Sequence, residues 1–427
     1  MTRGFRHVAP AGAPVGGADL LRWVALAGSR RDTTTLLRDA VADRFAVPHT
    51  FLTSTGRAGL AILLRALKSV ASSDKDEVVL PSYTCFSAAA SVVKAGLRPR
   101  IVDVDPTTLD YDPQALKLAD CSRAVALIAT NLYGLPNDLP ALSAFAREHQ
   151  LFLIDDAAQA MGASVGGRAS GSWGDAGLFS LDKGKNVSAI DGGIVVTHSS
   201  AIASAMRKEL ELLPAPPVSE VMAGVAKALV YSVMLRPSLY WIPNRIPQLG
   251  LGKTVFSTEF PLERPIPALT SLAVVMLQHL DEFTALRKKN AEALIAGLHD
   301  VSGIQLVTPR ADAVPVYLRL PILIADPEAR RRALTELRLA GIGASGSYPA
   351  SLADVQELQP WTASAGPVTG GRHIADRIVT LPTHPLVSAG DLERILEVLE
   401  QAMRGHSSRP ATGVTVGPSA PSTYFPG

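Results

Sequence analysis

Several side chains in the middle of the chain are of types that could act together on one small molecule. An apolar run ends in two adjacent carboxylates, Asp155 and Asp156. A second apolar segment ends at Ser180, and the loop after it carries Lys183 and Lys185. An unpaired buried charge is costly, and neighbouring side chains along a strand point in opposite directions. We therefore expect one of the two carboxylates to face a cleft and the other to face outward.

An amine, a carboxylate and a set of hydroxyl groups suit one cofactor in particular, pyridoxal phosphate. Its aldehyde forms a Schiff base with a lysine, its ring nitrogen needs a carboxylate to stay protonated, and its phosphate binds hydroxyl and N–H groups at a helix N-terminus. The sequence TSTGRA at residues 53–58 opens a predicted helix, and DGG at residues 191–193 allows close backbone approach. Taken alone, each feature is typical of a helix cap, a surface charge or a solvated loop. Their order along the chain favours the cofactor.

The segments that must position these residues alternate between helical and strand-like patterns from about residue 36 to residue 200. Such alternation indicates crossover connections and a largely parallel sheet. Ligands of these sheets bind beyond the carboxyl ends of the strands, which is where Asp156 and Ser180 lie in the sequence. The predicted helices cover residues 36–45, 58–70 and 87–95, and the predicted strands cover residues 77–81, 98–104, 123–130 and 150–154.

The second half of the chain has a different composition. A Pro- and aromatic-rich stretch is followed by a predicted long amphipathic helix over residues 267–298, and then by a smaller α/β segment with strands at 316–324 and 379–381 and helices at 327–340 and 389–403. The expected organisation is an N-terminal segment (1–35), a large cofactor-binding domain (36–210), a helical insertion and connector (211–263), the long helix with a small C-terminal domain (264–404), and a disordered tail (405–427).

Composition excludes several classes of protein. The 427 residues carry 41 Lys+Arg and 39 Asp+Glu, a formal net charge of +2, so no basic excess is available to bind nucleic acid. Cys85 and Cys121 cannot build a disulfide framework and lack metal-ligand spacing, so we expect no metal site. The sequence contains neither a signal-peptide pattern at its N-terminus nor an apolar window long enough to span a membrane. These features predict a cytoplasmic protein of roughly two to four domains.

The stretch over residues 218–251 has two interpretations. It contains Lys227, Arg236, Trp241 and Arg245 among apolar residues, a pattern also found in helices that lie on a membrane surface. The favoured interpretation is ordinary structure of the substrate-binding part. Membrane contact is the alternative.

As a set, the motifs resemble those of the DegT/DnrJ/EryC1/StrS family of pyridoxal phosphate-dependent sugar aminotransferases. FSLDKGKN (179–186) is similar to the family's Schiff-base motif, LIDDAAQA (153–160) to its pyridine-binding strand end, and STGRAGL (54–60) to its phosphate-binding helix start. Further landmarks follow in the family's order: LPSYTC (80–85), VDVDP (102–106), NLYG (131–134), GSWGD (171–175) and LPTHP (381–385). The resemblance covers roughly residues 36–403. It implies the fold type I architecture, a mostly parallel central sheet in a large domain with a smaller C-terminal α/β domain, and a homodimer with its active site at the subunit interface.

The resemblance also implies roles for single residues. Lys185 would form the Schiff base and move the proton between cofactor and substrate; its spacing from Ser180 and the asparagine after it favour it over Lys183. The other implied roles are Asp156 at the pyridinium nitrogen, Gln159 at the ring phenolate oxygen, and Ser180 with the main chain of Gly56 and Arg57 at the phosphate.

Some positions depart from the family pattern. Arg57 stands where many members have threonine, so either its guanidinium or only its N–H serves the phosphate. Cys85 occupies the position of an aromatic that stacks on the cofactor ring; Tyr83, Phe86 or an aliphatic side chain are the candidate replacements. Arg264 is aligned with an arginine that reaches the partner subunit, but it lacks the neighbouring asparagine, and Asn131 stands in place of a common histidine. For Tyr348 and His384 the favoured interpretation is a structural role, and contact with substrate from the small domain is the alternative.

The function implied is a ping-pong transamination from an amino acid, typically glutamate in this family, to a keto-sugar, expected to be nucleotide-linked. A dehydratase on the same scaffold is one alternative, although such enzymes have a histidine at the position of Lys185. The other alternative is a non-catalytic homologue, which the substitutions at Arg57 and Cys85 allow.

Overall fold

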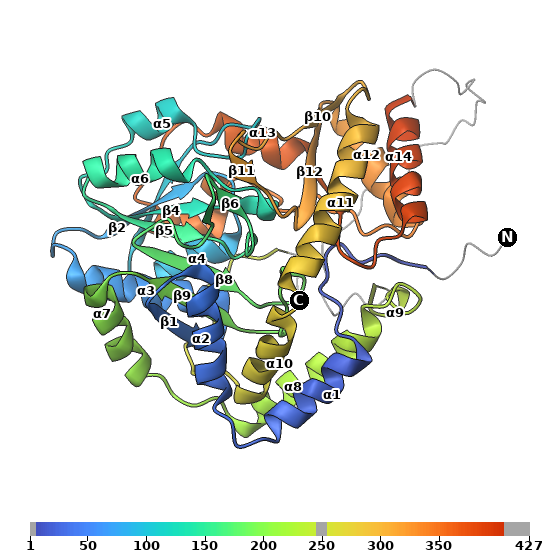
Figure 1. Ribbon diagram of the computed structural model, residues 1–427. Helices are drawn as coiled ribbons and strands as arrows, with labels where there is room; N and C mark the ends of the chain where they lie inside the picture. Colours follow the sequence, from blue (N-terminus) through green and yellow to red (C-terminus); the bar gives the residue numbers. More distant parts are fainter. Residues whose placement is uncertain (1–5, 245–253, 405–427) are drawn as a thin grey trace, which may run out of the picture.

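An eight-stranded sheet forms the centre of the computed structural model, which describes residues 6–244 and 254–404 (Figure 1). Strand β9 is antiparallel to both of its neighbours, and every other adjacent pair is parallel. The expected mostly parallel sheet is therefore confirmed. In spatial order the strands are β1 (His49–Thr53), β9 (Gly193–Thr197), β8 (Ala176–Ser180), β5 (Phe152–Asp156), β4 (Ala124–Thr130), β2 (Glu77–Pro81), β3 (Arg98–Val102) and β13 (Ser364–Ala365).

Helices cover both faces of this sheet. In β2, Val78 and Leu80 pack into one apolar core, and Val79, pointing the other way, packs into another. Burial on both faces explains why the strands are continuous apolar runs rather than alternating ones. Helices α3 (Gly56–Val70), α4 (Phe86–Lys94) and α7 (Ser200–Glu211) cover the first face, and α5 (Pro113–Leu118) and α6 (Leu139–Glu148) cover the second.

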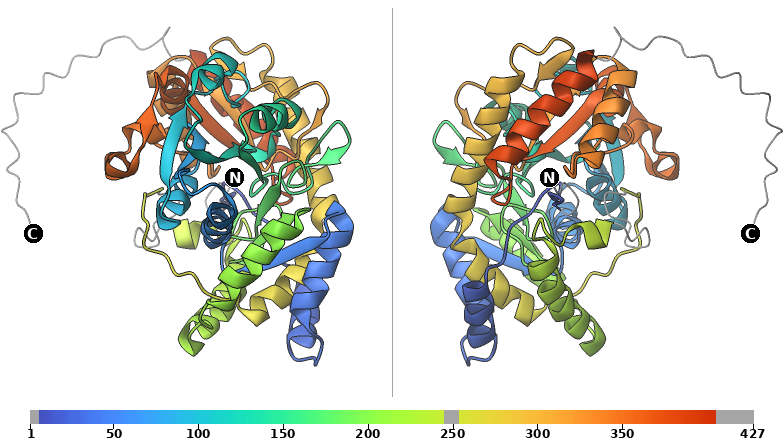
Figure 2. Two further views of the ribbon diagram at one scale, coloured as in Figure 1. Left: turned by 90° about the vertical axis from the view of Figure 1, so that its left-hand side faces the viewer. Right: turned by 90° about the vertical axis from the view of Figure 1, so that its right-hand side faces the viewer.

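A group of helices at one end of the molecule lies opposite the C-terminal elements (Figure 2). Helix α10 (Pro267–Leu277) packs against α1 (Gly17–Ala27), α2 (Thr33–Phe45) and α8 (Val218–Met234). Small residues allow the α8 contact, since a Cβ on Gly224 would lie 3.1 Å from Ile266 and 3.3 Å from Leu269. The opposite side of α8 is apolar and exposed at Val218, Met222, Leu229, Val230 and Val233.

The prediction of a single long helix over residues 267–298 is wrong in one respect, because this segment contains two helices. It is divided into α10 and α11 (Leu280–Leu298), with Gln278 and His279 between them. At His279 the backbone has φ −89° and ψ −1°, which departs from the usual α-helical values of about −63° and −42°. The His279 Nε2 atom lies 2.9 Å from the Asp19 carboxylate of α1, so the break is fixed by a tertiary contact.

The C-terminal elements build a smaller antiparallel sheet, made of β10 (Ile304–Leu306), β12 (Arg319–Ile324) and β14 (Ile378–Pro382) and covered by α11, α12 (Pro327–Leu339) and α14 (Ala389–Arg404). Two short strands join this region to the rest: β13 pairs with β3, and β11 (Ala313–Val314) pairs with β6 (Ser164–Val165), which also pairs with β7 (Arg168–Ala169). The remaining elements are α9 (Trp241–Asn244), α13 (Thr369–Arg377) and the 3₁₀ helices η1 (Leu132–Gly134), η3 (Leu352–Asp354) and η4 (Gln356–Trp361).

In the part of the chain that the structure describes, none of the helices has the length and apolar character needed to cross a bilayer. The tail expected to be disordered, residues 405–427, lies outside the described residues, as do residues 245–251 of the segment considered for membrane contact.

Candidate active site

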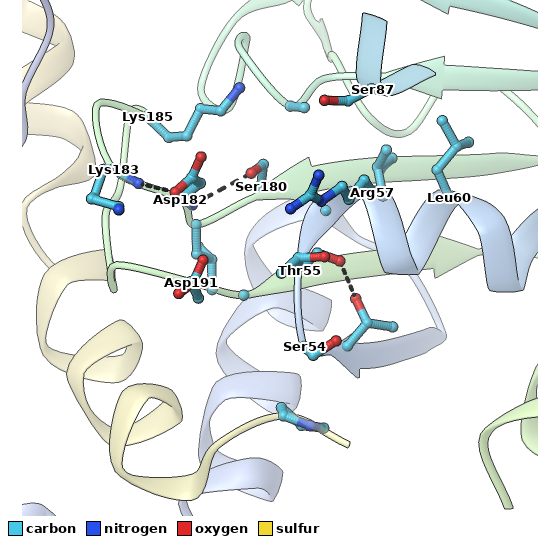
Figure 3. A pocket seen from close by; sticks show the side chains of 18 of the residues that line it. Ser54, Thr55, Arg57, Leu60, Ser87, Ser180, Asp182, Lys183, Lys185 and Asp191 are labelled. Atoms are coloured by element: carbon cyan, nitrogen blue, oxygen red, sulfur yellow. Dashed lines mark hydrogen bonds between the residues drawn. The ribbon is translucent and has the colours of Figure 1, made fainter. Parts of the chain in front are cut away.

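A cavity of about 770 Å³ lies where the carboxyl ends of β5 and β8 meet the N-terminus of α3. Its size is typical of a site for a cofactor or small substrate. Figure 3 shows Lys185 and Arg57 entering this space from different elements, with Ser180 between them. The lining contains all the residues that the sequence suggested for cofactor binding: Gly56, Arg57, Cys85, Asp156, Gln159, Ser180 and Lys185.

Asp155, the first carboxylate at the end of β5, is fully buried beneath a loop. It accepts hydrogen bonds from the Asn131 side-chain amide (2.8 Å) and from the N–H groups of Gly171 (2.6 Å) and Trp173 (3.2 Å). Burial raises the pKa of Asp155 to about 6. The expectation that one carboxylate of the pair faces outward is therefore wrong, because Asp155 faces neither the cavity nor solvent. The loop after β7 covers it and supplies the donors that make its burial tolerable.

Asp156, the second carboxylate, lines the cavity and is half-buried. One oxygen accepts the N–H of Ala158 at 3.0 Å. Burial raises the pKa of Asp156, and the positive charge of Lys185 opposes that effect. The amine and the carboxylate line the same cavity, as a shared ligand between them requires.

The loop between β8 and β9 presents both lysines to the cavity. Asp182 organises it: its carbonyl oxygen accepts the N–H of Lys185 (3.2 Å), and its carboxylate accepts the N–H of Lys183 (2.7 Å; Figure 3). Gly184 stands between the lysines with φ +76°, a conformation that disfavours any side chain.

The N-terminus of α3 forms a polar cradle beside Ser180. Thr55 caps the helix by accepting the N–H of Ala58 at 3.1 Å. The Ser54 hydroxyl is buried and has no hydrogen-bond partner among the described residues. A Cβ on Gly56 would lie 3.0 Å from both Cβ and Oγ of Ser180, so glycine permits the close approach of helix and strand. A helix N-terminus with free N–H groups and adjacent hydroxyls is a site for an anion such as phosphate.

Arg57 also contributes to this wall of the cavity. Its guanidinium carbon lies 5.0 Å from the centre of the buried Phe260 ring, and the Lys94 amine lies 5.4 Å from the same centre. Arg57 thus lines the cavity, and its guanidinium makes a cation–π contact with the Phe260 ring.

Gln159 is oriented by contacts that the sequence did not suggest. Its Oε1 atom accepts the N–H of Tyr133 (3.1 Å), and its Nε2 atom donates to the Tyr348 hydroxyl (2.9 Å). Tyr348 comes from the C-terminal half and fixes the side-chain amide of a cavity residue. His384, by contrast, is fully buried and its Nε2 atom lies 2.9 Å from the Ala9 carbonyl oxygen.

Two positions that depart from the family pattern have clear surroundings. Cys85 is half-buried at the N-cap of α4 and lines the cavity. Tyr83 and Phe86, the aromatic candidates to replace it, are buried and contact Tyr348 instead. Asn131 borders the cavity, but its amide binds Asp155 and its oxygen accepts a backbone N–H, so it serves to hold the strand ends.

One wall of the cavity comes from the segment predicted as an insertion and connector. Glu220 and Lys227 of α8, together with Glu263 and Arg264, line it. Lost hydration and the nearby Glu220 carboxylate raise the pKa of Glu263. Arg264, which the resemblance aligns with an arginine that reaches the partner subunit, borders the cavity of its own subunit. No cluster of three or more His, Cys, Asp or Glu residues in the described chain is arranged to hold a metal ion.

Solved structures share this fold. TlmJ, an aminotransferase from Streptoalloteichus hindustanus, superposes with a TM-score of 0.75 at 24% identity, covering 95% of this chain and 100% of the other. A GDP-4-keto-6-deoxy-D-mannose-3-dehydratase from E. coli, solved with bound hydrated pyridoxal phosphate, gives 0.75 at 16% identity, covering 93% and 100%. The architecture is that of the fold type I aminotransferases, as the sequence predicted.

The family follows from the sequence itself. The model of the DegT/DnrJ/EryC1/StrS aminotransferase family matches residues 27–213 and 268–400, and the chain belongs to this family of aminotransferases. A UDP-N-acetyl-3-dehydro-alpha-D-glucosamine 3-aminotransferase from Acidithiobacillus ferrooxidans is 27% identical, with 86% of this chain and 88% of the relative covered. A protein named pleiotropic regulatory protein from Geobacillus stearothermophilus is also 27% identical, with 79% and 82% covered.

Proposed function

We propose that this aminotransferase moves an amino group from L-glutamate to a nucleotide-linked keto-sugar, with pyridoxal phosphate bound covalently to Lys185. The observation that carries the proposal is the presence of Lys185, Asp156 and the α3 N-terminus around one cavity. The choice of acceptor is supported by the UDP-sugar substrate in the name of the Acidithiobacillus relative.

The groups around the cavity fit this cofactor. The Ser54 hydroxyl is buried without a partner in the described chain, and Gly56 leaves room against Ser180, so a phosphate would find donors in the cradle. Asp156 would stand at the ring nitrogen and Gln159 at the phenolate oxygen. When bound, pyridoxal phosphate supplies an aldehyde that links to amines and a protonated ring that withdraws electrons.

Each residue of the chain then has a task. The ionised Asp156 carboxylate would stabilise a protonated ring nitrogen, and the positive charge of Lys185 opposes the rise in pKa that burial causes in Asp156. With pyridoxal phosphate bound, the Lys185 Nζ atom would move a proton between the cofactor and substrate carbons. The Gln159 Nε2 atom keeps one hydrogen for a ligand, because Tyr348 accepts the other. Under this proposal Ser180 and the α3 N–H groups anchor the phosphate.

We also propose a homodimer in which each cavity lies near the partner subunit. Support comes from the family resemblance, in which an arginine aligned with Arg264 reaches the partner subunit.

Absorbance and product analysis test the function. The chain loaded with pyridoxal phosphate is expected to show the band of a lysine-bound cofactor, which changes when L-glutamate is added. Lys185→Ala should abolish the covalent adduct, whereas Lys183→Ala should retain it. Incubation of the aminated enzyme with nucleotide-linked keto-sugars should yield an amino sugar. A sugar that loses a hydroxyl group instead would identify a dehydratase, and a protein that stays colourless would be the non-catalytic homologue.

A further inference from the structure

The loop that carries Lys185 is held from behind by a buried arginine. Arg287 of α11 is fully buried. Its guanidinium donates to the main-chain carbonyl oxygens of Lys185 (3.3 Å), Asn186 (3.3 Å) and Gly12 (2.9 Å). The Lys185 N–H is bound to Asp182 at the same time. Both main-chain polar groups of Lys185 therefore have fixed partners.

The surroundings of Arg287 are unusual for a buried charge. Across residues 6–244 and 254–404, no carboxylate forms an ion pair with it. Burial lowers the pKa of Arg287 to about 10, which still leaves it protonated at neutral pH. A buried cation without a counter-ion is costly unless dipoles surround it. Here carbonyl dipoles replace the carboxylate, and two of the three belong to the lysine loop.

The third carbonyl belongs to an N-terminal strap, residues 6–16, that is itself firmly anchored. The Val8 N–H donates to Gly341 (2.8 Å), and His384 contacts the Ala9 carbonyl oxygen (2.9 Å). The Ala13 N–H donates to the hydroxyl of Tyr231 on α8 (3.3 Å), which also lies beside the main chain of Gly184. The strap thus gives Arg287 a fixed point against which the lysine loop is held.

We infer that Arg287 is a positioning residue: by binding the carbonyl oxygens of Lys185, Asn186 and Gly12, it fixes the lysine loop against the strap and determines which lysine receives the cofactor. The inference rests on the proposed function. Lys183 lies on the same loop and lines the same cavity, so the fold alone leaves two amines within it. With Arg287 in place, the main chain at Lys185 is held and its amine is presented. Without Arg287, the loop is free to present either amine.

The first test uses the full chain without cofactor. Amide hydrogen exchange over residues 181–190 should be about tenfold faster in Arg287→Lys, because an ammonium cannot bind three carbonyl oxygens in a fork geometry. Arg330→Lys is the matched control, since Arg330 also donates to two main-chain carbonyl oxygens, those of Ile378 and Ala375, but away from the lysine loop. Unchanged exchange over 181–190 in Arg287→Lys would overturn the inference.

The second test uses the chain with pyridoxal phosphate. Borohydride reduction followed by peptide mass spectrometry should place the label on Lys185 in the wild type and in Arg330→Lys. In Arg287→Lys and Arg287→Met, the ratio of label on Lys185 to label on Lys183 should fall by about tenfold, the loss expected for one charge-assisted hydrogen bond. A wild-type ratio in a folded Arg287 variant refutes the positioning role. Absence of label in the wild type refutes the proposed function instead.

Discussion

Gly56→Ala separates the role of the α3 N-terminus in stability from its role in binding. Gly56 is the first residue of α3, where alanine is intrinsically the better helix former. The added Cβ would lie 3.0 Å from Cβ and Oγ of Ser180, closer than ordinary packing allows. Ser180 must therefore move by a few tenths of an ångström. If both residues cradle the phosphate, the substitution disturbs the ligand more than it disturbs the fold.

The expected magnitudes differ for the two effects. The helix gains at most about 1 kcal/mol from replacing glycine, and the contact with Ser180 offsets this, so the free energy of unfolding of the cofactor-free chain should change by less than about 1 kcal/mol. A hydrogen bond to a charged group contributes about 1.5–3 kcal/mol. The loss of one such bond would weaken pyridoxal phosphate binding about 10- to 100-fold.

Urea denaturation of the cofactor-free chain and titration with pyridoxal phosphate measure the two quantities. Gly17→Ala is the matched control, because Gly17 also begins a helix and an added Cβ there meets no atom within 4 Å. The control should leave cofactor affinity unchanged. If Gly56→Ala binds pyridoxal phosphate as tightly as the wild type, the cradle of α3 and Ser180 is not the phosphate site.

Three further predictions concern residues around the cavity and its supports. Burial lowers the pKa of His384 to about 4. Because the unfolded state takes up the proton first as pH falls, the free energy of unfolding should decrease by about 2 kcal/mol between pH 7 and pH 5 on this account. Urea denaturation of His384→Gln should show a correspondingly weaker pH dependence. Tyr348→Phe removes the acceptor for the Gln159 amide, which should shift the pH at which the cofactor absorbance changes by about half to one unit; an unchanged titration would show that the orientation of Gln159 does not affect the ring. Asp156→Asn should lower kcat by about 100-fold or more while borohydride still traps the cofactor on Lys185; full activity in this variant would remove Asp156 from the ring nitrogen.

The sequence predicted the cavity residues because parallel strands bring their carboxyl ends to one edge of a sheet. Asp156 and Ser180 end the neighbouring strands β5 and β8, so two residues 24 positions apart converge through topology alone. The parallel sheet and the family were predictable for the same reason, since each apolar run and each motif is local in the chain. The preference for Lys185 over Lys183 rests on the family resemblance, in which the Schiff-base lysine follows a serine at the same spacing.

Other features depend on contacts that no local pattern contains. Gln159 and Tyr348 are separated by 189 residues, and Arg287 and Gly12 by 275. The burial of Asp155 depends on donors from a loop 16 to 18 residues downstream. Strand alternation correctly separates the two carboxylates, but the environment of each is set by the element that packs over it. Tertiary hydrogen bonds of this kind decide which polar residues serve the site and which support it.

The match to the family ends at residue 213 and resumes at residue 268, and part of the segment between borders the site. Its Glu220 and Lys227 line one wall of the cavity, while its Tyr231 meets the strap behind the lysine loop. Lys185 and Asp156, which under the proposed function handle the proton and the ring nitrogen, both lie in matched regions. Glu220 and Lys227 can differ in size and charge while Tyr231 keeps its contact with the strap, because the three side chains make separate contacts. Under the proposed function, an acceptor would meet this wall, while Lys185 and Asp156 lie in the matched part of the chain.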